Sequence, residues 1–130
     1  MSCPAGWMNL VSSCFYFSTN KAIWSQARAS CRKLGGDLAV LSNHKENNAV
    51  WNIVKQKQLG NPFIGLVRNQ DKKFYTVQGV KPSYINWYSG EPNNPHLEQC
   101  GQLLIHHNGQ WNDVSCNSKY HFICQIQLIK

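Results

Sequence analysis

Oxygen-bearing side chains gather in one short stretch of the chain, EPNNPHLEQC, which runs from residue 91 to residue 100. Two glutamates and two adjacent asparagines present oxygen atoms there, and two prolines restrict the backbone between them. The whole chain has only six acidic residues, so this concentration stands out. Such a stretch is either an ordinary polar loop or a site whose ligand needs several oxygen donors beside a cysteine.

The six cysteines also carry chemistry of their own. No CxxC pair occurs among them, which argues against a zinc ribbon or a thioredoxin-like redox site. An even number at wide spacing favours three disulfides formed in an oxidising compartment, so we expect a secreted, extracellular protein. Spacing alone leaves the pairing open. The cysteines are Cys3, Cys14, Cys31, Cys100, Cys116 and Cys124.

Charge and hydropathy argue against two further classes of protein. Thirteen basic and six acidic residues give a formal net charge of +7. The positive charge is dispersed, and no basic stripe interleaves with aromatic residues, so a solvated surface is favoured over a site for a polyanion such as nucleic acid or heparin, and we expect no nucleic-acid partner. No stretch approaches the roughly 18 apolar residues of a membrane span, and we therefore expect no membrane insertion.

The elements that must position the oxygen donors can be predicted along the chain. Residues 7–17 are rich in β-forming residues and predict a strand. A first helix is predicted after Asn20 as its cap, with apolar residues at helical spacing from Trp24 to Leu34. A second helix is predicted after Ser42 as its cap, and the turn formed by residues 60–62 ends it.

Short apolar runs separated by turn residues follow and predict strands. They include residues 63–67, 73–77 and 84–88, and a hairpin that turns at Asn108-Gly109. Between them, residues 69–99 form a long polar stretch, which is typical of a functional or disordered loop. The order of one strand, two helices and several strands is typical of an α+β fold.

Several short motifs, taken in order, resemble those of a C-type lectin domain over nearly the whole chain. They are CPAGW, CFYFS, the W-x-x-A-x-x-x-C spacing of residues 24–31, GGDLAVLSN, FIGL, NW at residues 86–87, EPN, WND and FIC. Each motif alone is weak, but their order and spacing are specific. The resemblance implies one carbohydrate-recognition domain over residues 1–130. Its fold would be C-type lectin-like, with two helices flanking antiparallel sheets and a long calcium-binding loop region.

The resemblance also implies how the cysteines pair. The expected disulfides are Cys3–Cys14, Cys31–Cys124 and Cys100–Cys116. The second of these closes about 90 residues, which the chain-entropy model values at roughly 4–5 kcal/mol. The third would hold together the two segments that carry the oxygen donors.

The same resemblance implies that the oxygen donors bind one calcium ion, a hard cation that takes about 6–8 oxygen ligands. In the family, two further ligand positions are filled by vicinal hydroxyls of a sugar, and the Glu-Pro bond is cis. The EPN motif implies mannose, N-acetylglucosamine or fucose rather than galactose, with Val114 as a small apolar contact beneath the sugar. The expected metal and sugar ligands are Glu91, Asn93, Glu98, Asn112 and Asp113.

One departure from the family pattern concerns a second calcium that many members hold beside the first. Arg68 and Asn69 stand where acids would be expected, and Gln99 replaces the acid before Cys100. We therefore expect Ca²⁺ at one site only. The segment between Asn93 and Glu98 is also about one residue shorter than usual, which bears on the fine sugar preference.

The resemblance predicts a mannose-type lectin of surface or microbial recognition, of the kind found in innate immunity. An enzyme is not expected, because no cysteine is left for Cys–His catalysis and a calcium-bound Glu91 or Glu98 would be a poor proton donor. Any homo-oligomer would be non-covalent for the same lack of a spare cysteine. The alternative is a protein-binding or ice-binding domain on the same fold, without sugar activity; a glycan hydrolase is a weaker alternative.

Overall fold

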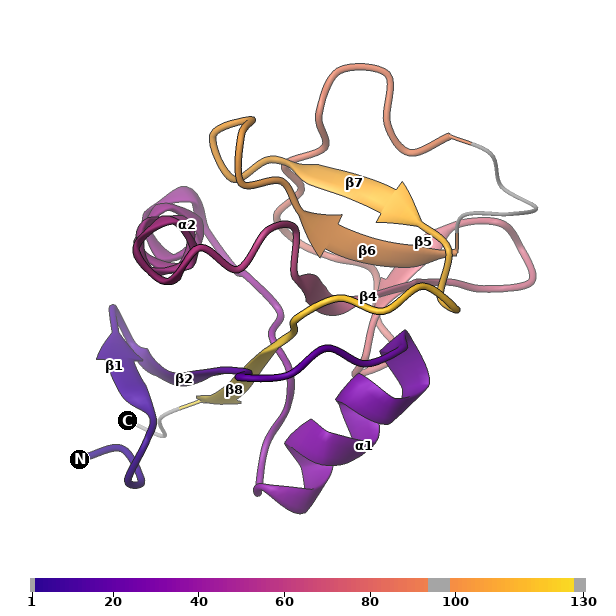
Figure 1. The fold of residues 1–130 in the computed structure, drawn as a ribbon. Helices are drawn as coiled ribbons and strands as arrows, with labels where there is room; N and C mark the ends of the chain where they lie inside the picture. Colours follow the sequence, from indigo (N-terminus) through magenta and orange to yellow (C-terminus); the bar gives the residue numbers. More distant parts are fainter. Residues whose placement is uncertain (1, 94–98, 128–130) are drawn as a thin grey trace.

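The computed structural model describes residues 2–93 and 99–127, and in these ranges the chain forms two helices and two antiparallel four-stranded sheets (Figure 1). The predicted α+β class is confirmed. The first sheet has the strand order β1-β2-β8-β3 and the second has the order β5-β4-β6-β7. The first sheet contains β1 (Met8–Leu10), β2 (Ser13–Phe17), β3 (Asp37–Leu38) and β8 (Ile123–Gln127); the second contains β4 (Phe63–Arg68), β5 (Phe74–Thr76), β6 (Cys100–Leu103) and β7 (Trp111–Val114).

Helix α1 (Trp24–Lys33) packs against β3, β8 and β4. It buries Trp24, Ala27 and Cys31, as their spacing predicts. One expectation about this helix was wrong. Its N-cap is Ile23 rather than Asn20, because the intervening Ala22 is held in a β-bridge to Tyr120. Leu34, which follows the helix, is exposed.

Helix α2 (His44–Lys57) is capped by Asn43 rather than by Ser42. The Asn43 side chain accepts a hydrogen bond from the backbone N–H of Glu46 at 2.8 Å, and Glu46 Oε1 accepts one from the backbone N–H of Ser42 at 3.0 Å. The helix ends at Gln58 in the left-handed conformation, two residues before the predicted glycine turn.

The strand predictions were correct in part. Residues 7–17 form two strands, β1 and β2, because the chain turns at Val11 with a φ of 61°. Residues 84–88 form no strand; they contribute one β-bridge, between Trp87 and Trp111. The predicted hairpin exists as β6 and β7, and Asn108 and Gly109 in its turn both have positive φ values.

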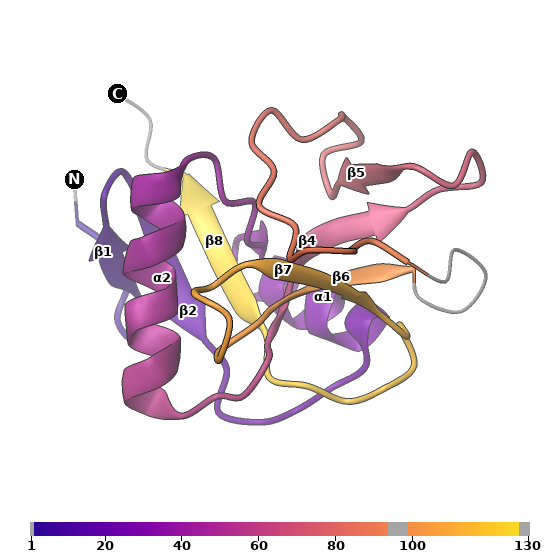
Figure 2. The same ribbon diagram turned by 90° about the horizontal axis from the view of Figure 1, so that it is seen from above.

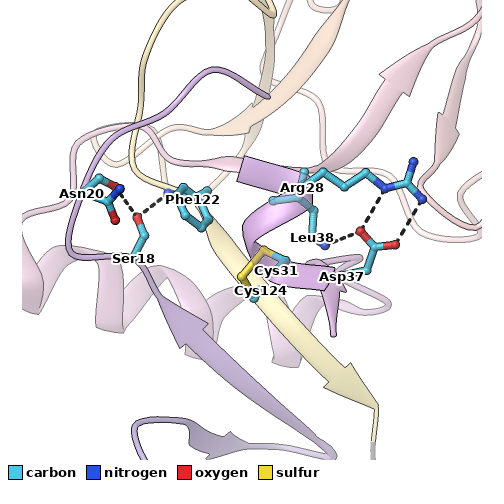
Figure 3. The surroundings of a disulfide bond; sticks show 8 residues. All are labelled: Ser18, Asn20, Arg28, Cys31, Asp37, Leu38, Phe122 and Cys124. Carbon is cyan, nitrogen blue, oxygen red and sulfur yellow. Dashed lines mark hydrogen bonds and ion pairs between the residues drawn. A yellow bond between two sulfur atoms is a disulfide. The ribbon is translucent and has the colours of Figure 1, made fainter. Parts of the chain in front are cut away.

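All three expected disulfides are present, namely Cys3–Cys14, Cys31–Cys124 and Cys100–Cys116. The second ties α1 to β8 across 93 residues of sequence (Figure 3). On the same side of α1, Arg28 reaches over to Asp37 on β3, with Nε and Oδ1 3.1 Å apart. The helix is therefore fixed to the first sheet both covalently and by charge.

A buried asparagine connects α2 to the second sheet. Asn47 is fully buried; its Nδ2 donates to the carbonyl of Gly109 at 2.9 Å, and its Oδ1 accepts from Trp111 Nε1 at 2.9 Å. Gly109 has a φ of 72°, and a Cβ there would lie 2.8 Å from the Cβ of Trp51. The hydrogen bonds of Asn47 and the close packing of Gly109 on Trp51 therefore position the turn just before β7, the strand that carries the WND motif.

Candidate calcium and sugar site

Asp113 on β7 is the centre of the described part of the candidate site. Its side chain is completely buried, and its Oδ2 accepts two hydrogen bonds. One comes from the backbone N–H of Asn93 at 2.7 Å and the other from the Arg68 guanidinium at 2.8 Å. Within the described residues its second oxygen, Oδ1, is buried and accepts no hydrogen bond.

Arg68, at the end of β4, ties three segments of the chain together. Besides Asp113 Oδ2, its guanidinium donates to the carbonyl of Asn93 at 3.2 Å and to the carbonyl of Lys72 at 2.8 Å. It also lies over the ring of Phe74, 4.6 Å from the ring centroid. The positive charge of Arg68 therefore lies beside the candidate ligands, at a position where the family pattern predicts an acidic residue.

Glu91 and Asn93 reach the same place from the long connection between β5 and β6. The backbone N–H of Glu91 donates to the carbonyl of Tyr88 at 2.9 Å, and the Glu91–Pro92 bond is cis, as expected. Glu91 Oε1 is buried. Asn93 meets Asp113 and Arg68 through its backbone, as described above. In Figure 1 this connection extends on the side of the second sheet away from α1.

The side chain of Asn112 lies on the face of β7 opposite to that of Asp113, because successive residues of a strand point to opposite faces. Its Nδ2 donates to Gln102 Oε1 at 3.0 Å, and Gln102 is its cross-strand partner on β6. The side-chain oxygen of Asn112 is thus the atom that a metal could use. Val114, on that same face, is only 9% exposed and belongs to the core cluster around Cys100 and Phe122, so little of it reaches solvent.

Of the five expected ligands, the structure places Asn93 against Asp113 through its backbone N–H, and Glu91 lies two residues before Asn93 with its Oε1 buried. Asn112 adjoins them on β7, and Glu98 lies outside the described residues. Two contacts were not predicted from the sequence. They are the hydrogen bond from Asn112 to Gln102 and the ion pair between Arg68 and Asp113. Arg68 was noted as a departure from the family pattern, but nothing in its local sequence indicated which carboxylate it would bind.

The donor set suits a hard cation. A buried carboxylate oxygen with no hydrogen-bond donor is costly, about 1–3 kcal/mol or more for a charged group. Asp113 Oδ1 is such an atom within the described residues, and Glu91, Asn93 and Asn112 add only oxygen atoms as metal ligands. Calcium prefers such oxygen ligands. The described residues contain no group of three or more His, Cys, Asp or Glu side chains placed to hold a metal by themselves.

Two helices and two antiparallel sheets are held by three disulfides, and the oxygen donors lie at the end of a disulfide-closed hairpin. A family model described as the lectin C-type domain matches residues 20–126, and the chain belongs to this family. Members are typically non-enzymatic binding proteins that bind carbohydrate, generally with Ca²⁺.

Relatives of several kinds share this fold. A perlucin-like protein of Mytilus galloprovincialis is 30% identical over 95% of this chain and 83% of its own length. The cow CD23 carbohydrate-recognition domain, solved in the presence of a GlcNAc2Man3 oligosaccharide, is 28% identical with a TM-score of 0.85, covering 99% of this chain and 98% of that one. A calcium-independent type II antifreeze protein is 27% identical with a TM-score of 0.88, covering 98% and 96%.

Several of the curated relatives are longer proteins. The chain spans between 32% and 52% of the length of three of them, so it corresponds to one part of such proteins. Lectin-domain relatives are often secreted or extracellular. Over the described ranges, neither helix has the length and apolar character needed to cross a bilayer.

Proposed function

We propose that the chain is a calcium-dependent lectin domain, spanning residues 1–130, that recognises sugars with vicinal equatorial hydroxyls. The observation that carries this proposal is the buried Asp113 Oδ1, which accepts no hydrogen bond from the described residues and points to a cation as its partner. The EPN and WND motifs supply the other oxygen donors. The proposed metal ligands are Glu91, Asn93, Glu98, Asn112 and Asp113.

Calcium, when bound, would supply direct coordination of two neighbouring sugar hydroxyls. The residues of the chain supply the hydrogen bonds that orient those hydroxyls. A glutamate accepts the hydroxyl proton, and an asparagine amide donates to the hydroxyl oxygen. Glu91 with Asn93 provides one such pair, and this order of acid and amide favours mannose, N-acetylglucosamine or fucose over galactose.

Asn112 has a more constrained role in this proposal. Its Nδ2 already donates to Gln102, so a hydrogen bond from Asn112 to a sugar would have to replace or share that bond. The apolar contact from Val114 would likewise be limited to its small exposed part. Both features favour a shallow site that holds one sugar weakly, with a dissociation constant on the order of 1 mM.

Weak binding of single sugars suits the recognition of dense glycans on a cellular or microbial surface. Several copies acting together can raise the avidity roughly 10²–10⁴-fold when their spacing allows. All six cysteines are paired, so an assembly of copies would be non-covalent. We infer that the protein is secreted and that it binds one calcium only. The Arg68 guanidinium, paired with Asp113, supports a single ion, because it puts a positive charge where acids would be expected for a second one.

Thermal melting and competition for immobilised mannan test this proposal together. Calcium is expected to raise the melting temperature over that in EDTA, because the ligands converge only in the folded state. Mannose is then expected to compete for binding to immobilised mannan, and galactose to compete much more weakly. Equal melting temperatures with calcium and with EDTA would remove the metal, and galactose competing better than mannose would refute the sugar assignment.

A second candidate function is binding of ice or of a protein without calcium. The similarity to a calcium-independent type II antifreeze protein favours it, because that protein shares the fold at a TM-score of 0.88. An ice-binding domain would shape growing ice crystals equally well in calcium and in EDTA. A lectin would not affect ice growth, and its mannan binding would end in EDTA.

A further inference from the structure

A basic pocket lies next to the proposed sugar site. It has a volume of about 460 Å³, and its lining residues come from the turn between β4 and β5 and from the connection that follows β5. Figure 2 shows the course of these two segments on either side of β5. Pro92, the middle residue of the EPN motif, lines the pocket. A ligand that leaves the sugar site past Pro92 would therefore enter this pocket.

Three exposed lysines, Lys72, Lys73 and Lys81, line the pocket. The acidic residue on the same turn is Asp71, which accepts a hydrogen bond from the Tyr75 hydroxyl. That hydrogen bond is the main reason that the pKa of Asp71 is lowered, so Asp71 is ionised at neutral pH. Asp71 thus offsets one of the three ammonium charges, and the pocket keeps a positive charge.

The rest of the lining is apolar. Phe74 and Trp87 pack together with ring centroids 4.9 Å apart, and Ile85 beside them is 60% exposed. Aromatic and aliphatic surface of this kind accepts the C–H face of a sugar ring, and ammonium groups accept an anion. The combination fits a sugar that carries a negative group better than it fits a bare inorganic ion.

Arg68 holds this pocket in a fixed relation to the sugar site. One of its nitrogens donates to the carbonyl of Lys72 and another to the carbonyl of Asn93. Lys72 has a φ of 66°, a conformation that is uncommon for residues other than glycine and that this hydrogen bond helps to hold. The lysine turn and the EPN segment are therefore anchored to the same guanidinium, whose own charge is compensated by Asp113.

We propose that this pocket is a subsite for an anionic group, a sulfate ester or a carboxylate, on a glycan whose neighbouring sugar occupies the calcium site. The inference rests on the proposed lectin function and names its preferred ligands as acidic glycans. The cationic groups serve recognition at short range, beyond the general attraction that a net charge of +7 exerts on any polyanion.

The test compares two double variants of equal charge. Lys72→Gln with Lys81→Gln removes two pocket lysines, and Lys45→Gln with Lys57→Gln removes two exposed lysines from α2, at the other side of the molecule (Figure 2). Each protein is titrated, in calcium and over a salt series, with mannan, with sparsely sulfated mannan and with sparsely carboxymethylated mannan. The two modified polymers separate sulfate from carboxylate as the preferred group.

The wild-type protein is expected to bind at least one modified mannan more tightly than plain mannan. The pocket variant is expected to lose about threefold or more of that affinity, as the loss of two exposed ion pairs implies, while the α2 variant loses clearly less. The dependence of the logarithm of affinity on the logarithm of salt concentration should flatten by about one to two units in the pocket variant alone. Binding of plain mannan should be the same in all three proteins.

The outcomes also separate this inference from the proposed function. If plain mannan binds with calcium but both variants lose equal affinity for the modified polymers, the subsite is overturned and the lectin function stands. If no mannan binds in calcium, the lectin function itself fails. Pocket-dependent binding that persists in EDTA would overturn the link to the calcium site, and an equal loss of affinity for single-stranded DNA would overturn the assignment to glycans.

Discussion

Replacing Arg68 by methionine removes the positive charge beside Asp113 and keeps an unbranched side chain that can still pack on Phe74. In the wild-type protein the side chains of Arg68 and Asp113 are 7% and 0% exposed, and Nη2 and Oδ2 lie 2.8 Å apart. Without the guanidinium, the Asp113 carboxylate keeps its hydrogen bond from Asn93 but has lost its charge partner. The folded state then contains a buried carboxylate that neither water nor a cation compensates.

Breaking a buried ion pair by removing one partner costs about 3–5 kcal/mol. The two backbone carbonyls that Arg68 binds, those of Lys72 and Asn93, lose a donor as well, but both lie near the surface and can turn to water. In a domain of this length 1 kcal/mol moves the melting temperature by about 3–5 °C, so we expect Arg68→Met to melt about 10–20 °C below wild type in EDTA.

Calcium is expected to recover part of this loss. A cation bound at Asp113 Oδ1 would compensate the same carboxylate, so the difference in melting temperature between calcium and EDTA should be larger in Arg68→Met than in wild type. The matched control is Arg32→Met. Arg32 is 62% exposed and pairs with Asp37 at 3.4 Å, so its removal should cost no more than about 1 kcal/mol.

The assay is thermal unfolding followed by circular dichroism, with each protein in calcium and in EDTA. An Arg68→Met melting temperature in EDTA within the range of the Arg32→Met control would refute the view that this ion pair stabilises the site. A variant that is destabilised but gains no more from calcium than wild type would refute the idea that the metal and Arg68 share Asp113.

Three further predictions concern other residues. Burial raises the pKa of Glu46 above its usual 4.5, so the folded state binds a proton more readily than the unfolded state. The free energy of unfolding, measured with urea in EDTA, should therefore increase as the pH falls from neutral toward 4.5. Glu46→Gln should remove the part of this increase that comes from Glu46. Asn47→Ala should cost about 1–3 kcal/mol in urea unfolding, because it leaves the buried Trp111 Nε1 without an acceptor, while the carbonyl of Gly109 keeps only its 3.3 Å hydrogen bond from Asn86; an effect below about 0.5 kcal/mol would contradict this. Glu91→Gln combined with Asn93→Asp should shift competition from mannose toward galactose on a mannan matrix, and unchanged selectivity would exclude these two residues from hydroxyl recognition.

The family and its disulfides could be predicted because they depend on short motifs with fixed order. The positions of Cys31 and Cys124 identify their pairing once the family is known, and the structure has that bridge. The EPN and WND motifs likewise identify candidate ligands, because their side chains carry the oxygen atoms that a calcium ion would bind. Short local motifs therefore predicted the framework of the fold, and they supply the ligands that we propose for the site.

What the sequence could not indicate were contacts between residues far apart in the chain. Arg68 and Asp113 are separated by 45 positions, and Asn47 and Trp111 by 64, with nothing local to link them. The short stretch at residues 84–88 has the composition of a strand, yet Trp87 makes only a single bridge, because tertiary packing rather than propensity decides β-pairing.

The arrangement of the first sheet has a practical consequence for orientation. β1 and β8, the first and last strands, both pair with β2, and both views place them at the opposite end of the molecule from β5 and the long connection that carries the EPN motif (Figures 1 and 2). A tether attached through either strand would thus point the sugar-facing side outward. Beads that carry the protein attached near β1 should display as many accessible sites as beads that carry it attached near β8. Copies anchored side by side in this way would all face a glycan surface.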